Sequence, residues 1–271
     1  GGLGVPLYQP VRKLLTAATT YYVRKDGSDS NTGLADTAGG AFLTIQKGID
    51  TLSGIDFGSY QATLQVRGSG VTYTEALVLK NWTGALPPII IGDTTTPANI
   101  ILDSAGDTIT NNGNPLWIIK GFKITSSGGK GVYAVNGGRI NFSDINFGVT
   151  NSVQIWSQTG IIFAIGNYTI SGSPIAGIHA AATSGGYCSL TGAAVVSIPN
   201  VLAFVNFFVL AARNGVLEAF ATTPYTGAGL AATTGSRYNA NLNGVVYVGG
   251  AGVNYFPGNA AGTTTTGGQY A

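Results

Sequence analysis

A pattern of apolar residues recurs along the middle of the chain and limits the folds that the chain can adopt. Its order is apolar-x-apolar-x-x-apolar-x-apolar, and successive copies start 23, 23 and 25 residues apart. The two central positions of each copy are polar or glycine, as a corner between two short strands requires. The four copies are Trp117, Ile119, Phe122, Ile124; Ile140, Phe142, Ile145, Phe147; Phe163, Ile165, Tyr168, Ile170; and Cys188, Leu190, Ala193, Val195.

A second apolar element follows each copy in step, so that each repeat contains three short strands. This element starts at Val132, Ile155, Ile178 and Ala203. A unit of about 23 residues without a helix cannot bury its apolar side alone and has to stack on its neighbours. Leucine-rich repeats need a Leu/Asn consensus that is absent, and a propeller blade needs about 40 residues. The repeat therefore predicts an all-β parallel β-helix, with roughly seven coils about 4.8 Å apart between about Thr63 and Phe220.

The segment "FLTIQKGIDTLS", residues 42–53, carries the helical signal of the chain. Ile45, Ile49 and Leu52 share one face of a helix, and Thr44 can cap its start. We expect this short helix to lie across the open N-terminal end of the solenoid, where it would cover the exposed edge of the first coil.

The loop "YYVRKDGSDSNTG", residues 21–33, offers oxygen ligands of the kind that calcium prefers. An EF-hand loop requires Gly at its sixth position and Glu at its twelfth. Counting from Asp29 places Leu34 and Gly40 there, so a chain of Asx turns is favoured over a metal site. We expect no metal and no cofactor.

Four residues at equivalent coil positions form the candidate site. Tyr133, Trp156, His179 and Phe204 each stand between two residues expected to point inward, so we expect them to form one outward column. Such a column could contact a ligand such as a sugar, could be buried against another subunit, or could be a ladder stabilised by its own stacking. Ligand contact and intersubunit contact remain open for these four residues.

The stretch "VLAFVNFFVLAARNGVLEAF", residues 201–220, is apolar on both faces of the expected strands. A solenoid exposed to water would not tolerate such a surface. We therefore expect a homo-oligomer, most simply a homotrimer packed around a three-fold axis.

Composition argues against several classes of protein. Charged residues make up only 9% of the chain and the net charge is +2, which gives no electrostatic footprint for nucleic acid. The longest apolar run, residues 201–212, is too short for a membrane-spanning helix, which needs about 20 residues, so we expect no membrane insertion. Cys188 is the only cysteine and is expected to fill a core position, while His179 is the only histidine and hence the only candidate imidazole base.

Acidic residues are too sparse for an obvious glycosidase centre. Hydrolysis of a glycosidic bond usually needs two carboxylates about 5 to 9.5 Å apart. Glu218 is the only acid after Asp144, and about three coils separate the two. Asp103 and Asp107 lie close together but fit turns. We therefore expect no catalytic residues within one chain. The distance between carboxylates of one chain does not exclude a site assembled from residues of different subunits.

Three stretches near the two ends carry a family resemblance. They are "YYVRKDGSDSNTG" followed by "GGAFLTIQKGIDTL", "YTEALVLKNWTG" with "GDTTTPANIIL", and "YFPGNAAGTTTTGGQYA". The first contains an "FxTIQxxID" helix formed by Phe42, Thr44, Ile45, Gln46, Ile49 and Asp50. These stretches resemble right-handed parallel β-helix proteins of bacteriophage tails and prophages. The resemblance implies a homotrimeric tail fibre or tailspike on the virion, outside the cell, that contacts other tail proteins and a bacterial surface glycan or outer-membrane receptor.

The predicted elements divide the chain into four parts. We expect an attachment segment at 1–20, a leading loop and capping helix at 21–62, the β-helix at 63–226 and a closing or tip segment at 227–271. Two alternatives remain: a tailspike depolymerase with an intersubunit site, and a secreted bacterial β-helix adhesin or pectate-lyase-like protein.

Overall fold

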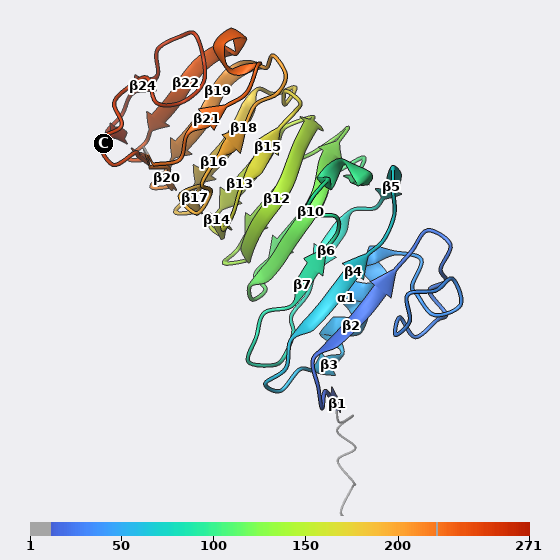
Figure 1. Ribbon diagram of the computed structural model, residues 1–271. Helices are drawn as coiled ribbons and strands as arrows, with labels where there is room; N and C mark the ends of the chain where they lie inside the picture. Colours follow the sequence, from blue (N-terminus) through green and yellow to red (C-terminus); the bar gives the residue numbers. More distant parts are fainter. Residues whose placement is uncertain (1–11, 221) are drawn as a thin grey trace, which may run out of the picture.

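The computed structural model describes residues 12–220 and 222–271 and shows strands stacked side by side along one axis (Figure 1). The strand pairings between named strands are parallel, and the described residues contain a single α-helix, α1 (Ile45–Ser53), with two 3-10 turns. The prediction of an all-β parallel solenoid is confirmed. Its strands run from Thr19 to Tyr270, so the expected closing segment also contributes rungs. Most of the expected attachment segment lies outside the described residues.

The main sheet forms one long side of the solenoid. Each strand between the first and the last pairs with the strand one coil earlier and with the strand one coil later. In spatial order they are β2 (Thr19–Val23), β4 (Ala62–Val66), β7 (Ile89–Ile91), β10 (Trp117–Ser126), β12 (Arg139–Thr150), β14 (Ile161–Ala164), β17 (Tyr187–Ser189), β20 (Val216–Glu218), β23 (Val245–Tyr247) and β25 (Gln269–Tyr270).

A second sheet of eight strands closes the coil on another side. Its order is β6 (Leu77–Leu79), β9 (Ile109–Asn112), β11 (Val132–Val135), β13 (Val153–Gln158), β16 (Ile178–Thr183), β19 (Ala203–Ala212), β22 (Thr234–Asn241) and β24 (Thr263–Thr264). The predicted alternation of its inner and outer residues is visible in β11, where Val132 and Ala134 are buried and Tyr133 and Val135 are half-buried.

A third row of strands bends away from the main sheet at a corner. It consists of β5 (Val71–Thr74), β8 (Ile100–Asp103), the second halves of β10 and β12, β15 (Tyr168–Ile170), β18 (Val196–Ser197) and β21 (Tyr225–Thr226). The corner falls at Gly121 and Asp144, whose φ angles are +75° and +54°. A side chain at Gly121 would meet backbone atoms of Asp93 at 2.7 Å, so the close approach of the coils requires glycine there. A short pair formed by β1 (Lys13–Leu14) and β3 (Ile55–Asp56) completes the described strands.

The predicted register is confirmed for the first pair of repeats and is wrong by one or three residues in parts of the later ones. Trp117 pairs with Ile140 and Phe122 with Ile145, as the 23-residue spacing predicts. Ile140, however, pairs with Ile162, so Phe163 and Ile165 point outward rather than inward. Tyr168 pairs with Val196 rather than with the predicted Ala193, a difference of three residues. Residues 161–165 are all apolar, so alternation alone could not select which face is buried.

The interior is filled by large apolar side chains stacked from coil to coil. Phe122, Phe142 and Phe147 are fully buried, and Trp117 is buried with its indole N–H donating to the Lys80 carbonyl at 2.8 Å. Burial of each such side chain contributes roughly 1.5–3 kcal/mol to stability. Cys188 is fully buried in this core, as expected.

Helix α1 packs against β2, β4 and β6 and caps the N-terminal end of the coil, which confirms the prediction. Thr44 is its N-cap and accepts the Lys47 amide at 3.2 Å. The carboxylate of Glu75 accepts the amides of Ile45 and Gln46 at 3.0 Å each. Since the first amides of a helix have no partner within it, these carboxylate and hydroxyl groups satisfy them.

The side chain of Gln46 takes the place of a missing strand. Its amide oxygen accepts the Val78 N–H at 2.9 Å, and its amide nitrogen donates to the Val78 carbonyl at 3.2 Å. Val78 belongs to β6, the first strand of the second sheet. The leading loop does the same for β2, because the Phe42 amide donates to the Tyr22 carbonyl and the Arg24 amide donates to the Phe42 carbonyl, each at 2.9 Å. The first strands of both long sheets are therefore covered.

The Asp/Ser/Asn loop holds this cap in position. Asp29 accepts the amides of Leu43 and Thr44 at 2.9 Å and the Thr44 hydroxyl at 2.7 Å, and Asn31 donates to the carbonyls of Ala38 and Ala41. The loop residues that resembled calcium ligands thus serve the start of α1.

Candidate binding surfaces

Two of the four predicted site residues lie together on the outer face of the second sheet. Tyr133 in β11 is in register with Trp156 in β13, and their ring centroids are 5.8 Å apart. Both side chains are half-buried. The backbone directs them outward because their neighbours Val132, Ala134 and Ile155 fill the core.

A lysine and three polar side chains fix these two rings. The ammonium group of Lys130 lies 4.2 Å from the centre of the Tyr133 ring and 5.1 Å from that of Trp156. It also pairs with Asp107 at 3.1 Å. The Tyr133 hydroxyl donates to Gln158 at 2.6 Å, and the Trp156 indole N–H donates to the hydroxyl of Thr183 at 2.9 Å. We call Tyr133, Trp156 and Lys130 the lateral platform.

The electrostatics of the platform follow from its partial burial. Desolvation raises the pKa of the Tyr133 hydroxyl, and the negative charge of Asp107 adds to this effect. The hydroxyl therefore stays protonated and continues to donate to Gln158. A cation over two aromatic faces is attracted by their quadrupoles, typically by about 0.5–1 kcal/mol at an exposed site.

His179 does not belong to the outward column, and that prediction is wrong. Its side chain is fully buried between Phe147, Tyr168 and Phe208, with ring centroids 5.0 to 5.7 Å away. The residue in register with Trp156 is Ala181, because this coil is 25 residues long rather than 23. His179 therefore cannot contact a ligand or another subunit.

The hydrogen bonds of His179 define its tautomer. The Gln154 amide nitrogen donates to the carbonyls of Gly148 and Gly172 at 2.7 Å, which leaves its oxygen to accept from Nδ1 of His179 at 2.7 Å. Nε2 then accepts from the Tyr168 hydroxyl at 3.3 Å. Complete burial lowers the pKa of His179 to about 3 and raises that of Tyr168, so this histidine is a neutral core residue and not an accessible base.

Phe204 is also an interior residue, contrary to the prediction. It is 1% exposed and packs edge-on against Phe208, with the centroids 4.9 Å apart. The column above Trp156 continues instead through Ala181 to Leu210. Ala181 and Leu210 differ by 29 positions, since the loop before β19 is longer than in earlier coils. Val205, next to Phe204, is the outward residue and is 77% exposed.

The outer face of the main sheet carries a second apolar surface that the sequence reasoning missed. Phe163 packs on Tyr187, with centroids 5.4 Å apart, and the Tyr187 hydroxyl donates to Glu218. The register predicted from the repeat places Phe163 inside the solenoid, so the sequence analysis does not predict this surface. Its half-buried or exposed members, here called the outer stripe, are Ile161, Phe163, Tyr187, Val216, Val245 and Tyr247. Ile89 and Ile118 lie on the same face but are separated from the stripe by Arg139 and Asn141 of β12.

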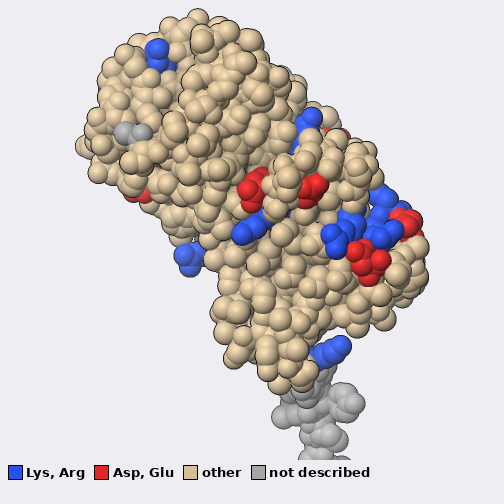
Figure 2. Space-filling model, viewed as in Figure 1, with Lys and Arg blue, Asp and Glu red and all other residues tan. Residues whose placement is uncertain are grey.

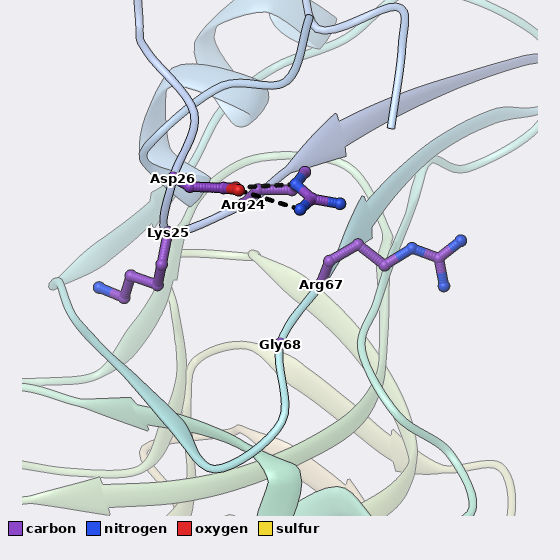
Figure 3. Close-up of a pocket in the computed structure, with 5 residues that line it drawn as sticks. All are labelled: Arg24, Lys25, Asp26, Arg67 and Gly68. Atoms are coloured by element: carbon purple, nitrogen blue, oxygen red, sulfur yellow. Dashed lines mark hydrogen bonds and ion pairs between the residues drawn. The ribbon is translucent and has the colours of Figure 1, made fainter. Parts of the chain in front are cut away.

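The charged side chains gather over the N-terminal half of the face shown in Figure 2, and the C-terminal half of that face is almost uncharged. One hollow of about 220 Å³ lies among these charges (Figure 3). Arg24 and Asp26 are joined there by hydrogen bonds of 2.8 and 3.0 Å, and Arg24 also pairs with Asp36 at 3.1 Å. The Arg24 guanidinium lowers the pKa of Asp26. These groups satisfy one another, and Asp36 also pairs with Arg67, the residue after β4, at 2.8 Å, which holds the leading loop against this strand.

The residues considered for catalysis have structural partners. Asp103 accepts from the Thr125 hydroxyl at 2.7 Å, Asp107 pairs with Lys130, and Glu218 accepts from Tyr187. Burial raises the pKa of Cys188 to about 12, so almost none of it is thiolate at neutral pH. Within residues 12–220 and 222–271, no three His, Cys, Asp or Glu side chains are grouped as metal ligands.

Comparisons with known proteins leave the family of the chain open. No protein-family model matches the sequence, and no curated protein matches it either. In the described part of the chain, no helix has the length and apolar character needed to cross a membrane.

Proposed function

We propose that the chain is a structural and receptor-binding component of a bacteriophage tail, a fibre or tailspike, that recognises a bacterial surface glycan or outer-membrane receptor. The proposal includes a location on the virion outside the cell and contact with other tail proteins. It rests on the sequence resemblance and is compatible with the solenoid fold. The winding is proposed to be right-handed, the hand of nearly all crossovers between parallel strands.

The observation that carries the binding role is the lateral platform. Two aromatic rings and an ammonium group face outward, and hydrogen bonds to Gln158 and Thr183 hold the rings in place. Aromatic faces suit the apolar faces of sugar rings, while Lys130 and Asp107 offer polar contacts at the edge. Because the coils hold these groups in position before binding, little ordering entropy is lost on contact.

A homotrimer would cover the outer stripe. Its side chains run from β14 to β23 along the main sheet, and apolar groups gathered on an outer face mark interaction sites. Three copies would also present three lateral platforms. Weak contacts to a repetitive glycan would then add through avidity.

The test is binding of the purified chain to a panel of bacterial surface polysaccharides. We expect a variant with both Tyr133→Ala and Trp156→Ala to lose about tenfold or more in affinity, since each ring supplies roughly a kcal/mol. Thr169→Ala, which removes a half-buried side chain from the third row, is the matched control. Equal binding by the double variant would contradict the platform, and new reducing ends on the polysaccharide would instead support a depolymerase.

A further inference from the structure

A hollow of about 420 Å³ lies near the C-terminal end of the solenoid, away from the lateral platform. It is formed by β21, the 3-10 turn η2 (Leu230–Ala232), β22 and residues 254–258. Its size falls in the range of small-molecule sites. The lining residues that carry the argument are Tyr225, Tyr255, Phe256, Arg237 and Asn254.

The aromatic side of this hollow is rigid. The Tyr255 ring packs against Phe256 and Tyr225, with centroids 4.9 and 5.5 Å away. Its hydroxyl lies 2.7 Å from the Phe220 carbonyl and 2.9 Å from that of Thr223, which fixes the ring relative to the last coils. Phe256 is buried, whereas Tyr255 is half-buried and presents part of its ring to the hollow.

The cationic side of the hollow is Arg237, whose charge is not neutralised by the described residues. One terminal nitrogen, Nη1, donates to the Ala260 carbonyl at 3.0 Å. Arg237 forms no ion pair within residues 12–220 and 222–271. The only acid in the sequence after Asp144 is Glu218, which accepts from Tyr187.

Unpaired polar atoms concentrate at this hollow. In the described part of the chain, three buried side-chain polar atoms have no hydrogen-bond partner, and two belong to residues that line it: the Tyr225 hydroxyl and Nε of Arg237. Both atoms are enclosed, the Tyr225 hydroxyl beside Tyr168 and Tyr255, so a ligand in the hollow would meet the Tyr225 ring and the rest of the Arg237 guanidinium rather than these two atoms. The other terminal nitrogen of Arg237, Nη2, makes no hydrogen bond within the described residues and can donate a charge-assisted hydrogen bond to a carboxylate.

We propose that this hollow binds a saccharide that carries a carboxylate, a uronic acid. Tyr225 and Tyr255 would contact the face of the sugar ring, Arg237 would bind its carboxylate, and the exposed amide of Asn254 would contact a ring hydroxyl. The inference concerns a different site from the lateral platform and does not require the phage role.

The test compares two oligosaccharides that differ only in the acid group. The first is trigalacturonic acid, and the second is the same trimer with its carboxylates reduced to primary alcohols. By calorimetry we expect the wild-type chain to bind the acid at least tenfold more tightly. Equal affinity for the two, or no binding of the acid, would overturn the proposal. Full competition by equimolar inorganic phosphate would also overturn it, since a bare anion site would suffice.

Variants locate the site. We expect Arg237→Gln to weaken binding of the acid by about 10- to 100-fold, the range for a charge-assisted hydrogen bond. Arg213→Gln makes the same charge change in a turn that does not line the hollow and should leave affinity unchanged. Unchanged affinity in Arg237→Gln, with thermal unfolding like that of the wild type, would overturn the assignment. The variant with both Tyr133→Ala and Trp156→Ala should still bind the acid, so failure of the lateral platform and failure of this site are distinguishable.

Discussion

The imidazole of His179 is buried with both nitrogens in contact with core groups. Nδ1 donates to Gln154, and Nε2 faces the Tyr168 hydroxyl. Protonation at Nε2 would remove its acceptor and place a charge among aromatic rings. Burial therefore holds the pKa of His179 at about 3 in the folded chain, whereas an unfolded histidine titrates near 6.5.

This difference predicts a pH dependence of stability. Between about pH 6.5 and pH 3 the unfolded chain binds a proton at His179 that the folded chain does not bind. The folding equilibrium constant should therefore fall by roughly tenfold for each pH unit below 6.5 from this residue alone. Urea unfolding at pH 7, 6 and 5 would measure it.

The control for this prediction is His179→Gln, which cannot titrate. The variant is expected to be less stable at pH 7 because it leaves core partners unsatisfied, but its pH dependence should be shallower than that of the wild type. Parallel curves for the two proteins would contradict the account of His179 as a neutral core histidine.

At the scale of elements, helix α1 and the first coil are joined by the Gln46 side chain. Its amide makes both of the hydrogen bonds that a neighbouring strand would make with Val78. Gln46 also donates to Asp50 one turn later at 2.8 Å, which orients the amide.

Replacement of Gln46 by Met keeps the shape of the side chain and removes its hydrogen-bonding groups. We expect the free energy of unfolding to fall by about 1–3 kcal/mol, because the backbone groups of Val78 lose their partners. Exchange of the Val78 amide hydrogen should also accelerate. The matched control is Lys47→Met on the same helix, and an equal loss of stability in both variants would refute the specific role of Gln46.

The sequence predicts those elements whose signal is local. Thr44, Ile45, Ile49 and Leu52 identify the helix, and polar pairs mark the corner at Gly121 and Asp144. The pairing of Gln46 with Val78 has no periodic signature, because a side-chain amide contacts a backbone 32 residues away.

The candidate site was predictable only where the coil length stays constant. Tyr133 and Trp156 are one regular coil apart and do meet. Beyond them the loops lengthen, and Cys188 pairs with Leu217, 29 positions later. A loop can absorb extra residues without altering the strand spacing, so a fixed period drifts out of register. A fixed period of 23 to 25 residues therefore predicts surface positions for His179 and Phe204 that the structure does not show.

On the scale of the whole molecule, the outer stripe predicts how copies associate. Phe163 lies in the stripe and packs on Tyr187. If copies associate through the stripe as proposed, a charge at this position should split the proposed trimer, since an uncompensated charge at an apolar interface is costly. We therefore expect Phe163→Glu to be monomeric with its β-sheet circular dichroism retained.

Light scattering coupled to size-exclusion chromatography measures the mass of each species. Thr169→Glu introduces the same charge on the third row and should keep the wild-type mass. A monomeric wild type, or a trimeric Phe163→Glu, would argue against assembly through the stripe.

The strand edges at the two ends of the solenoid differ in the partners that they have within the described residues. At the first coil, Gln46 and Phe42 occupy the edges of β6 and β2. At the last coil, β24 and β25 each pair on one side only within the described residues. Head-to-tail stacking of solenoids requires free strand edges on both joining ends. The cap on the first coil removes the edges at one of them and so blocks the growth by which exposed β-edges build fibrils.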